Sequence, residues 1–206
     1  MKFPIKKFED PAAYWVAYID EMYACARSVD GRNLIKAADA LAQLFVLGGT
    51  LYACGNGGSA SIANHLLCDF IKGVQTDTHL RPRVVSLSSH VELITAIGND
   101  IAFEDIFAYQ LRTAARPGDI LMSISSSGDS ENIVRAVDWA RANGLKTIAL
   151  TGFGGGRSAG FSEINIHVPA GNYGVIEDLH QSIMHVLAQF IRMRLMDSDL
   201  VAERKF

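Results

Sequence analysis

The sequence predicts an α/β fold built on an open parallel sheet, and three observations lead to it. Short apolar segments alternate with amphipathic helical segments in the order βαβαβαβ. The apolar segments lack strict alternation of polar and apolar residues, which is typical of strands covered on both faces. Two of them run into loops rich in glycine or serine that open directly into helices. In such sheets, ligands bind beyond the carboxyl ends of the strands.

Two helices are expected ahead of the first strand. Apolar residues recur at helical spacing from Pro11 through AAYWVAYIDEMYACARSV, and the pattern repeats over residues 33–47 after a break at Asp30-Gly31. Five strands are expected next, over residues 50–55, 83–87, 119–125, 145–151 and 164–168. The intervening and final segments are expected to be helical over residues 59–71, 102–115, 130–143 and 176–196.

The chain is expected to form a single domain. Its 206 residues, 49% of them hydrophobic, suffice for one sizeable core but do not promise two. Residues 1–48 would form the N-terminal helices, and residues 49–196 the α/β core with its long C-terminal helix. The polar tail, residues 197–206, is expected to fray.

Composition and charge exclude several classes of protein. A formal net charge of −3 gives no broad attraction for nucleic-acid phosphates or anionic membranes. The three cysteines show no CxxC spacing, which suits a reducing compartment better than a disulfide framework. No stretch of 18 apolar residues occurs, and the first residues lack the apolar run of a signal peptide. A cytoplasmic protein with no nucleic-acid or membrane partner is therefore expected.

Two loops could hold an anionic ligand. The first strand ends in Gly55-Asn56-Gly57-Gly58-Ser59, where glycines let the backbone approach a ligand, although such a turn can equally be only a tight connection. The third strand ends in Ser125-Ser126-Ser127-Gly128-Asp129-Ser130 and opens another helix. One serine could merely cap that helix. Four hydroxyls beside helix N–H groups favour phosphate binding instead.

A second constellation could hold a metal ion or move protons. His65 and Asp69 are four residues apart on one predicted helix, and Glu177 and His185 are eight apart on the last, so each pair shares a helix face. Two imidazoles and two carboxylates suit zinc, although iron, manganese or cobalt would also fit. For an arbitrary sequence, a surface pair and ordinary partly buried histidines would be the preferred interpretation.

Several motifs together resemble the phosphoheptose isomerases. They are CGNGGSAS followed by a helical histidine, GNDxxFEDIF at Gly98–Phe107, SSSGDSxNI, TGFGGG at Thr151–Gly156 and EDLHxxxxH. Their order matches that family from about Leu51 to Ile191, and they are specific as an ensemble. The resemblance implies a flavodoxin-like SIS (sugar isomerase) domain with three α/β/α layers, a five-stranded parallel sheet and extra N-terminal helices, assembled as a homotetramer.

The resemblance also implies a substrate and its binding residues. The expected reaction interconverts sedoheptulose 7-phosphate and D-glycero-D-manno-heptose 7-phosphate through an enediol. The phosphate and nearby sugar oxygens would be held by Ser59, Ser125, Ser126, Ser127 and Ser130. The remaining polar wall would comprise Asn56, Gly57, Asn99 and Asp100. Without the resemblance, Asn99-Asp100 would be interpreted only as an Asx turn that caps the following helix.

The resemblance implies one zinc ion per subunit, with a departure at two of the four ligands. The implied ligands are His65, Asp69, Glu177 and His185. The family usually has Glu where this chain has Asp69, and Gln where it has Glu177, so the four ligands carry two negative charges instead of one. Asp69 would be the base and His185 the acid. Glu177 is an alternative base, because a carboxylate can accept a proton and the family's usual amide cannot.

Two other functions remain open from the sequence. Some SIS proteins are non-catalytic binding modules, including a tetrameric partner of the bacterial replication initiator, and the substitutions at Asp69 and Glu177 could indicate lost chemistry. Both replacements keep a carboxylate, however, which favours an enzyme. The chain could also isomerise another sugar phosphate, since the sequence does not define the hydroxyl pattern that the site would read, nor the pathway.

Overall fold

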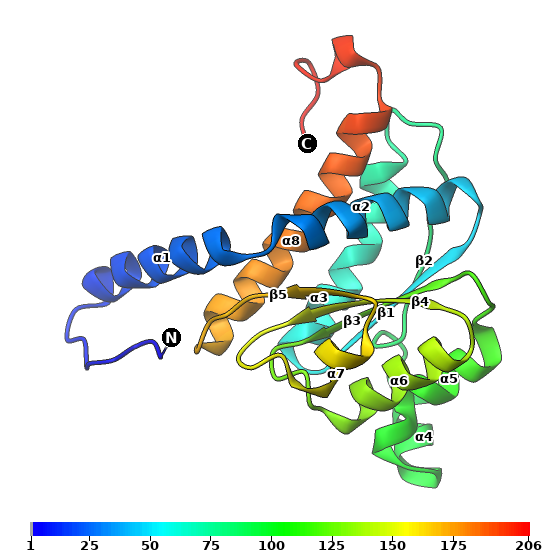
Figure 1. Cartoon of the computed structure of the whole chain (residues 1–206), viewed down its shortest axis with the longest axis horizontal. Coiled ribbons are helices and arrows are strands. Elements are labelled where there is room, and N and C mark those ends of the chain that lie inside the picture. The colour runs from blue at the N-terminus through cyan, green and yellow to red at the C-terminus, as the bar shows by residue number, and fades with distance from the viewer. Residues whose placement is uncertain (1) are drawn as a thin grey trace.

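The computed structural model describes residues 2–206 and has a five-stranded parallel sheet at its centre (Figure 1). The strand order is β2-β1-β3-β4-β5. The strands are β1 (Thr50–Gly55), β2 (Arg83–Ser86), β3 (Ile120–Ser125), β4 (Lys146–Thr151) and β5 (Ile164–His167). The chain passes from β1 to one neighbour, β2, and then returns to the other side with β3. The topological switch point, where ligands bind in such sheets, therefore lies between β1 and β3.

Helices cover both faces of the sheet (Figure 1). One face packs against α2 (Gly31–Val46), α3 (Gly58–Leu67) and α8 (Tyr173–Leu195), and the other against α5 (Ile106–Ala114) and α6 (Glu131–Ala142). The shorter elements are η1 (Cys68–Val74, a π-helical turn), α4 (Val91–Asp100), η2 (Phe103–Asp105), α7 (Gly156–Phe161) and η3 (Ser198–Leu200). The α/β/α architecture predicted from the sequence is confirmed.

The first helix, α1 (Pro11–Ser28), extends away from the sheet (Figure 1). Its start follows from local chemistry, because the Asp10 carboxylate accepts hydrogen bonds from the first-turn N–H groups and Pro11 needs no partner for its nitrogen. Tyr18 attaches the helix to α8 by donating its hydroxyl to Asp178 at 2.6 Å. Cys25 is the one residue of α1 that is buried.

The structure differs from the sequence expectations in four helical regions. Residues 91–100 form α4 and residues 156–161 form α7, neither of which was expected, and the helix expected over 102–115 begins with the 3₁₀ turn η2. The helix expected over 59–71 changes into the π-helical turn η1 at Cys68. Helical periodicity alone does not distinguish a π turn from an α turn, because the two differ by a single residue in hydrogen-bond spacing.

The last residues of the C-terminal tail contact Arg192 of α8. Arg192 is buried, and its guanidinium donates to the Lys205 carbonyl at 3.0 Å and to the Asp77 carboxylate at 2.9 Å. The ring of Phe206 lies 4.9 Å from the same guanidinium. A charged group at this depth requires partners, and the tail supplies two of them. Within residues 2–206, no helix combines the length and apolarity needed to cross a membrane.

One buried histidine makes the stability of this fold depend on pH. His180 of α8 is fully buried, its Nε2 lies 3.1 Å from the Thr151 carbonyl oxygen, and burial lowers its pKa to about 4. Between the usual pKa near 6.5 and that value, the unfolded chain binds a proton that the folded chain does not. The free energy of unfolding should therefore fall as the pH drops through this window, by at most about 1.4 kcal/mol per pH unit.

Chemical unfolding of His180→Gln at several pH values between 4 and 7 tests this expectation, with the exposed His79→Gln as control. The variant should lose part of the acid destabilisation that the parent and the control retain. Parallel pH curves for all three proteins would contradict the assignment.

Candidate active site

The loop after β1 requires glycine because other groups approach its backbone closely. Gly57 has φ of 54°, a left-handed conformation that side chains disfavour. A Cβ added at Gly58, the first residue of α3, would collide with the carboxylate of Glu177 from α8. The glycines therefore allow a carboxylate from the last helix to lie directly against the loop.

The loop after β3 orients its serines through its own backbone. The Ser125 hydroxyl accepts from the Gly128 N–H at 3.1 Å, and the Ser127 hydroxyl accepts from the Asp129 N–H at 3.3 Å. Ser130 occupies the N-cap position of α6, but among residues 2–206 none donates a capping hydrogen bond to its hydroxyl. Capping alone therefore does not account for Ser130, which leaves its hydroxyl available to a ligand.

The two loops meet in a hollow of about 160 Å³ beyond the ends of β1 and β3. Asn56 of the first loop and Asn132, in the first turn of α6, are joined by two amide hydrogen bonds, of 2.8 Å and 3.0 Å. The serine hollow, as we call it, is lined by Asn56, Ser59, Ile124, Ser125, Ser126, Ser127, Ser130, Tyr173 and Glu177. Six of the expected substrate residues are thus brought together with Glu177.

A group of three ionisable side chains lies farther along α8. His65 Nε2 is 3.3 Å from Asp69 Oδ1, and His185 Nδ1 contacts the other oxygen of the same carboxylate. The His65 and His185 rings meet edge to face, with centroids 5.2 Å apart. One potential ligand atom from each residue lies within 4.8 Å of the others. Two imidazole nitrogens and one carboxylate oxygen are a donor set suited to a catalytic zinc ion with an open position.

The π-helical turn accounts for the position of Asp69. Asp69 is the second residue of η1, so the helix widens between it and His65. π-Helical turns inside helices are frequently found at functional sites. Here the turn presents the short Asp69 side chain to imidazoles from both α3 and α8.

Gln181 is a site residue that the sequence analysis missed. Its Nε2 lies 2.9 Å from His185 Nε2, one helical turn along α8. When the amide donates to Nε2, the ring proton must reside on Nδ1, which then donates to Asp69. The i,i+4 spacing from both Glu177 and His185 was the available signal. Tyr173 of the serine hollow was also missed, because no motif marks it.

Gly57, the N-cap residue of α3, does not line the serine hollow, and three other expected site residues lie elsewhere. Glu177 lines the serine hollow, so the structure gathers three of the four expected metal ligands and places the fourth with the serines. Asn99 and Asp100 lie at the exposed end of α4, where the Asn99 amide donates to the Asp100 carboxylate at 2.7 Å. Neither of the two lines the serine hollow.

The sequence and fold of this chain are similar to those of known proteins. Residues 15–152 match the family model described as the SIS domain. A phosphoheptose isomerase of Nitratidesulfovibrio vulgaris is 40% identical over 155 residues, which cover 75% of this chain and 74% of that protein. The chain belongs to the phosphoheptose isomerase family. This membership confirms the resemblance drawn from the loops and identifies the chain as an isomerase.

Two solved members of the family share the fold closely. The phosphoheptose isomerase from Neisseria gonorrhoeae superposes with a TM-score of 0.80 at 31% identity, covering 88% of this chain and 96% of that chain. The phosphoheptose isomerase from Francisella tularensis gives a TM-score of 0.80 at 32% identity, over 91% and 98% of the two chains. The matches extend over nearly the whole length of both solved structures.

The geometry predicts which substitutions release a metal. His65→Ala, Asp69→Ala and His185→Ala should each lower bound zinc strongly, because each removes one member of the three-residue group. Glu177→Ala should retain most of it. Metal content measured after loading with zinc and gel filtration tests this, with the exposed His79→Ala as control. Loss of zinc from Glu177→Ala equal to that from Asp69→Ala would instead indicate a four-ligand site.

Proposed function

We propose that this chain isomerises sedoheptulose 7-phosphate to D-glycero-D-manno-heptose 7-phosphate. The observation that carries the proposal is the placement of the serine hollow and the His65–Asp69–His185 group along α8. Glu177 in the hollow and His185 in the group are eight residues apart, or about 12 Å along the helix axis. That separation is comparable with the length of an extended seven-carbon sugar phosphate. One end of the substrate would be anchored while the other reacts.

The phosphate would bind at the serine loop. Hydroxyls of Ser125, Ser126, Ser127 and Ser130 line the hollow, and the N–H groups at the start of α6 face the same end of the sheet. No lysine or arginine lines the serine hollow within the described chain. Neutral donors and the helix dipole would therefore hold the anion, as they do at other helix starts.

The reaction would require proton transfer at the other end of the sugar. A base removes a proton from C1 of the ketose while an acid protonates the carbonyl oxygen on C2, giving the enediol. Return of a proton to C2, with loss of the proton from the C1 hydroxyl, gives the aldose. Asp69 is assigned as the base and His185 as the acid. Gln181, whose Nε2 lies 2.9 Å from His185 Nε2, would orient the His185 ring.

A zinc ion, one per subunit, would be held by His65, Asp69 and His185, with Glu177 as the remaining candidate ligand. When bound, it would supply Lewis-acid polarisation of the sugar oxygens. The donor set of this chain is compatible with that role, because it leaves coordination positions for substrate.

Glu177 remains a second candidate for the base, because Asp69 contacts two imidazoles at once. A carboxylate engaged by two partners is less free to accept a carbon-bound proton. The family position nevertheless favours Asp69, and kinetics of the two variants distinguish the assignments.

A substrate screen tests the proposed reaction. Phosphorylated sugars of five, six and seven carbons should be compared on one preparation whose metal content has been measured. The proposal expects turnover to be greatest with sedoheptulose 7-phosphate. Preference for a shorter sugar would redirect the assignment, and phosphate binding without any turnover would favour a non-catalytic module.

Removal of two hydroxyls should weaken substrate binding. Ser127→Ala combined with Ser130→Ala is expected to raise KM by about tenfold or more, since each hydrogen bond to a charged group contributes about 1.5–3 kcal/mol. The fold should be retained, because neither hydroxyl caps α6. Ser198→Ala in the tail is the matched control. An unchanged KM in the double variant would refute phosphate capture by this loop.

Substitution of each carboxylate by its amide separates the two possible bases. Asp69→Asn is expected to lower kcat by about 10²-fold or more, which is the usual contribution of a general base. Glu177→Gln should keep most of the turnover. Bound metal must be measured on both variants, because Asp69 is also a candidate ligand. The reverse result, with metal retained, would transfer the role of base to Glu177.

We propose further that the enzyme is a cytoplasmic homotetramer. The apolar surface of α1, where Trp15 and Tyr23 are each 63% exposed, supports the assembly. The free cysteines Cys25, Cys54 and Cys68 support a reducing compartment. Light scattering at micromolar concentration should give four times the chain mass. A Trp15→Glu variant should lower that mass, and a monomeric parent protein would contradict the assembly.

A further inference from the structure

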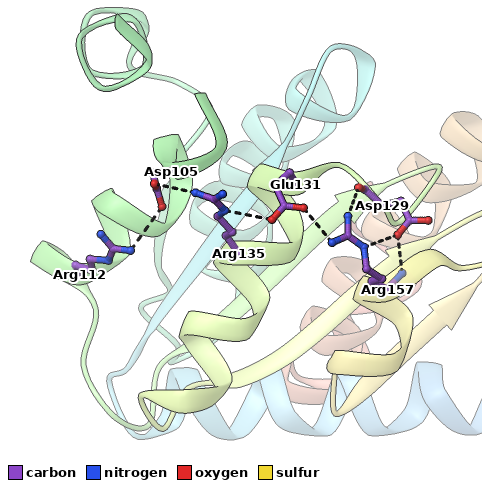
Figure 2. A network of polar contacts seen from close by, with 6 residues as sticks. All are labelled: Asp105, Arg112, Asp129, Glu131, Arg135 and Arg157. Atoms are coloured by element: carbon purple, nitrogen blue, oxygen red, sulfur yellow. Dashed lines mark hydrogen bonds and ion pairs between the residues drawn. The ribbon is translucent and has the colours of Figure 1, made fainter. Parts of the chain in front are cut away.

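Arg157, the second residue of α7, binds the serine loop through several hydrogen bonds (Figure 2). Its Nε donates to Asp129 Oδ1 at 2.9 Å, and its two terminal nitrogens donate to the Asp129 carbonyl and to Glu131 Oε2, each at 2.9 Å. Its backbone N–H also donates to Asp129 Oδ1, at 3.1 Å. One arginine thus holds both carboxylates that flank Ser130.

The backbone of the serine loop is hydrogen-bonded to the turn between β4 and α7, the helix that carries Arg157. Ser158 donates its N–H to the Gly128 carbonyl at 2.9 Å, and Gly152 donates its N–H to the Ser126 carbonyl at 3.0 Å. A Cβ at Gly128 would collide with the Gly155 carbonyl. The loop therefore rests on the turn between β4 and α7, and Arg157 extends from that turn over the outer side of the loop.

The contacts of Arg157 continue into a larger ion-pair network (Figure 2). Glu131 also pairs with Arg135 at 3.2 Å, which pairs with Asp105 at 3.0 Å. Arg112 lies 3.5 Å from the same Asp105 carboxylate. The network contains three carboxylates and three guanidinium groups, so its charges cancel. Networks of this kind contribute more than isolated surface pairs.

This neutralisation matters next to a phosphate site. Asp129 and Glu131 are ionised, because hydrogen bonds from Arg157 hold the pKa of each carboxyl below its usual value. Without Arg157, Asp129 would lose its ion-pair partner and Glu131 would keep only Arg135, so uncompensated negative charge would lie beside Ser130, where a phosphate dianion would bind. Like charges at such short range disfavour anion binding, although solvent screens part of the effect.

We propose that Arg157 is a positioning residue for phosphate recognition. It holds the serine loop in the conformation that binds phosphate and neutralises Asp129 and Glu131 without itself lining the serine hollow. This inference rests on the proposed phosphate site in the serine loop. The alternative is an ordinary surface ion pair, which would affect stability and leave ligand binding unchanged.

Four variants test the inference through two readouts: the kinetic constants for sedoheptulose 7-phosphate, and the rise in Tm on addition of inorganic phosphate. The variants are Arg157→Ala, Arg157→Lys, Arg157→Ala with Asp129→Asn, and Arg141→Ala. Arg141 is the matched control, because it forms a comparable exposed pair with Asp138 elsewhere on α6.

Arg157→Ala should raise KM and the apparent phosphate dissociation constant by about tenfold, and kcat should stay within about twofold. Arg157→Lys should recover part of the affinity, since it keeps the charge but not the forked hydrogen bonds. Addition of Asp129→Asn to Arg157→Ala should also recover part, because it removes one uncompensated charge. The control should match the parent protein.

The outcomes separate this inference from the proposed function. If the Ser127→Ala, Ser130→Ala double variant weakens phosphate binding and Arg157→Ala only lowers Tm, the positioning role is refuted and the phosphate site remains. If the serine variant binds phosphate normally, the phosphate site itself is misassigned and the inference falls with it. An equal loss of affinity in Arg141→Ala would attribute the effect to net charge and overturn the inference.

Discussion

The parallel pairing of β1 with β3 is the constraint on which the candidate site depends. The register runs from Leu51 beside Ile120 to Gly55 beside Ile124, so both strands end at the same level. Because β2 and β4 lie on opposite sides of this pair, the loops after β1 and β3 diverge and leave space between them. The Asn56–Asn132 amide pair then links the loop after β1 to the start of α6 across that space. A shift of one residue in this register would separate the glycine loop from the serines.

Helix α8 connects the serine hollow with the His65–Asp69–His185 group, because residues along it face different parts of the fold. Glu177 faces the glycine loop, His180 faces β4, and His185 faces Asp69. The buried face of the helix fixes its rotation, so these directions follow from core packing. The rigid helix also determines the distance between the serine hollow and the His65–Asp69–His185 group. A substrate that reaches both must therefore have a defined length.

Asp69 and Glu177, the two residues that differ from the family's usual ligands, are accommodated by the structure in different ways. Asp69 has a shorter side chain than the family's usual glutamate, and the π-helical turn holds it where His65 and His185 both reach it. Glu177 retains the length of the usual glutamine and lies against Gly58, at the start of α3. The positive end of that helix dipole favours a carboxylate there. The additional negative charge is thus located at a helix start and beside polar groups of the hollow.

Local patterns in the sequence were sufficient to determine the order of the five strands, the glycine and serine loops, the family and three residues that meet near α8. These features depend on short-range periodicity and on motifs that each occupy a few adjacent residues. Only the tertiary structure decided that Glu177 lines the serine hollow, that Asn99 and Asp100 lie at the exposed end of α4, and that the tail packs on Arg192. It also revealed the hydrogen bonds between Arg157 and Asp129, two residues that are 28 positions apart in the sequence. Such contacts depend on how helices and turns pack around the sheet, and no local pattern records that packing, because each side chain's partner is set by elements distant in the sequence.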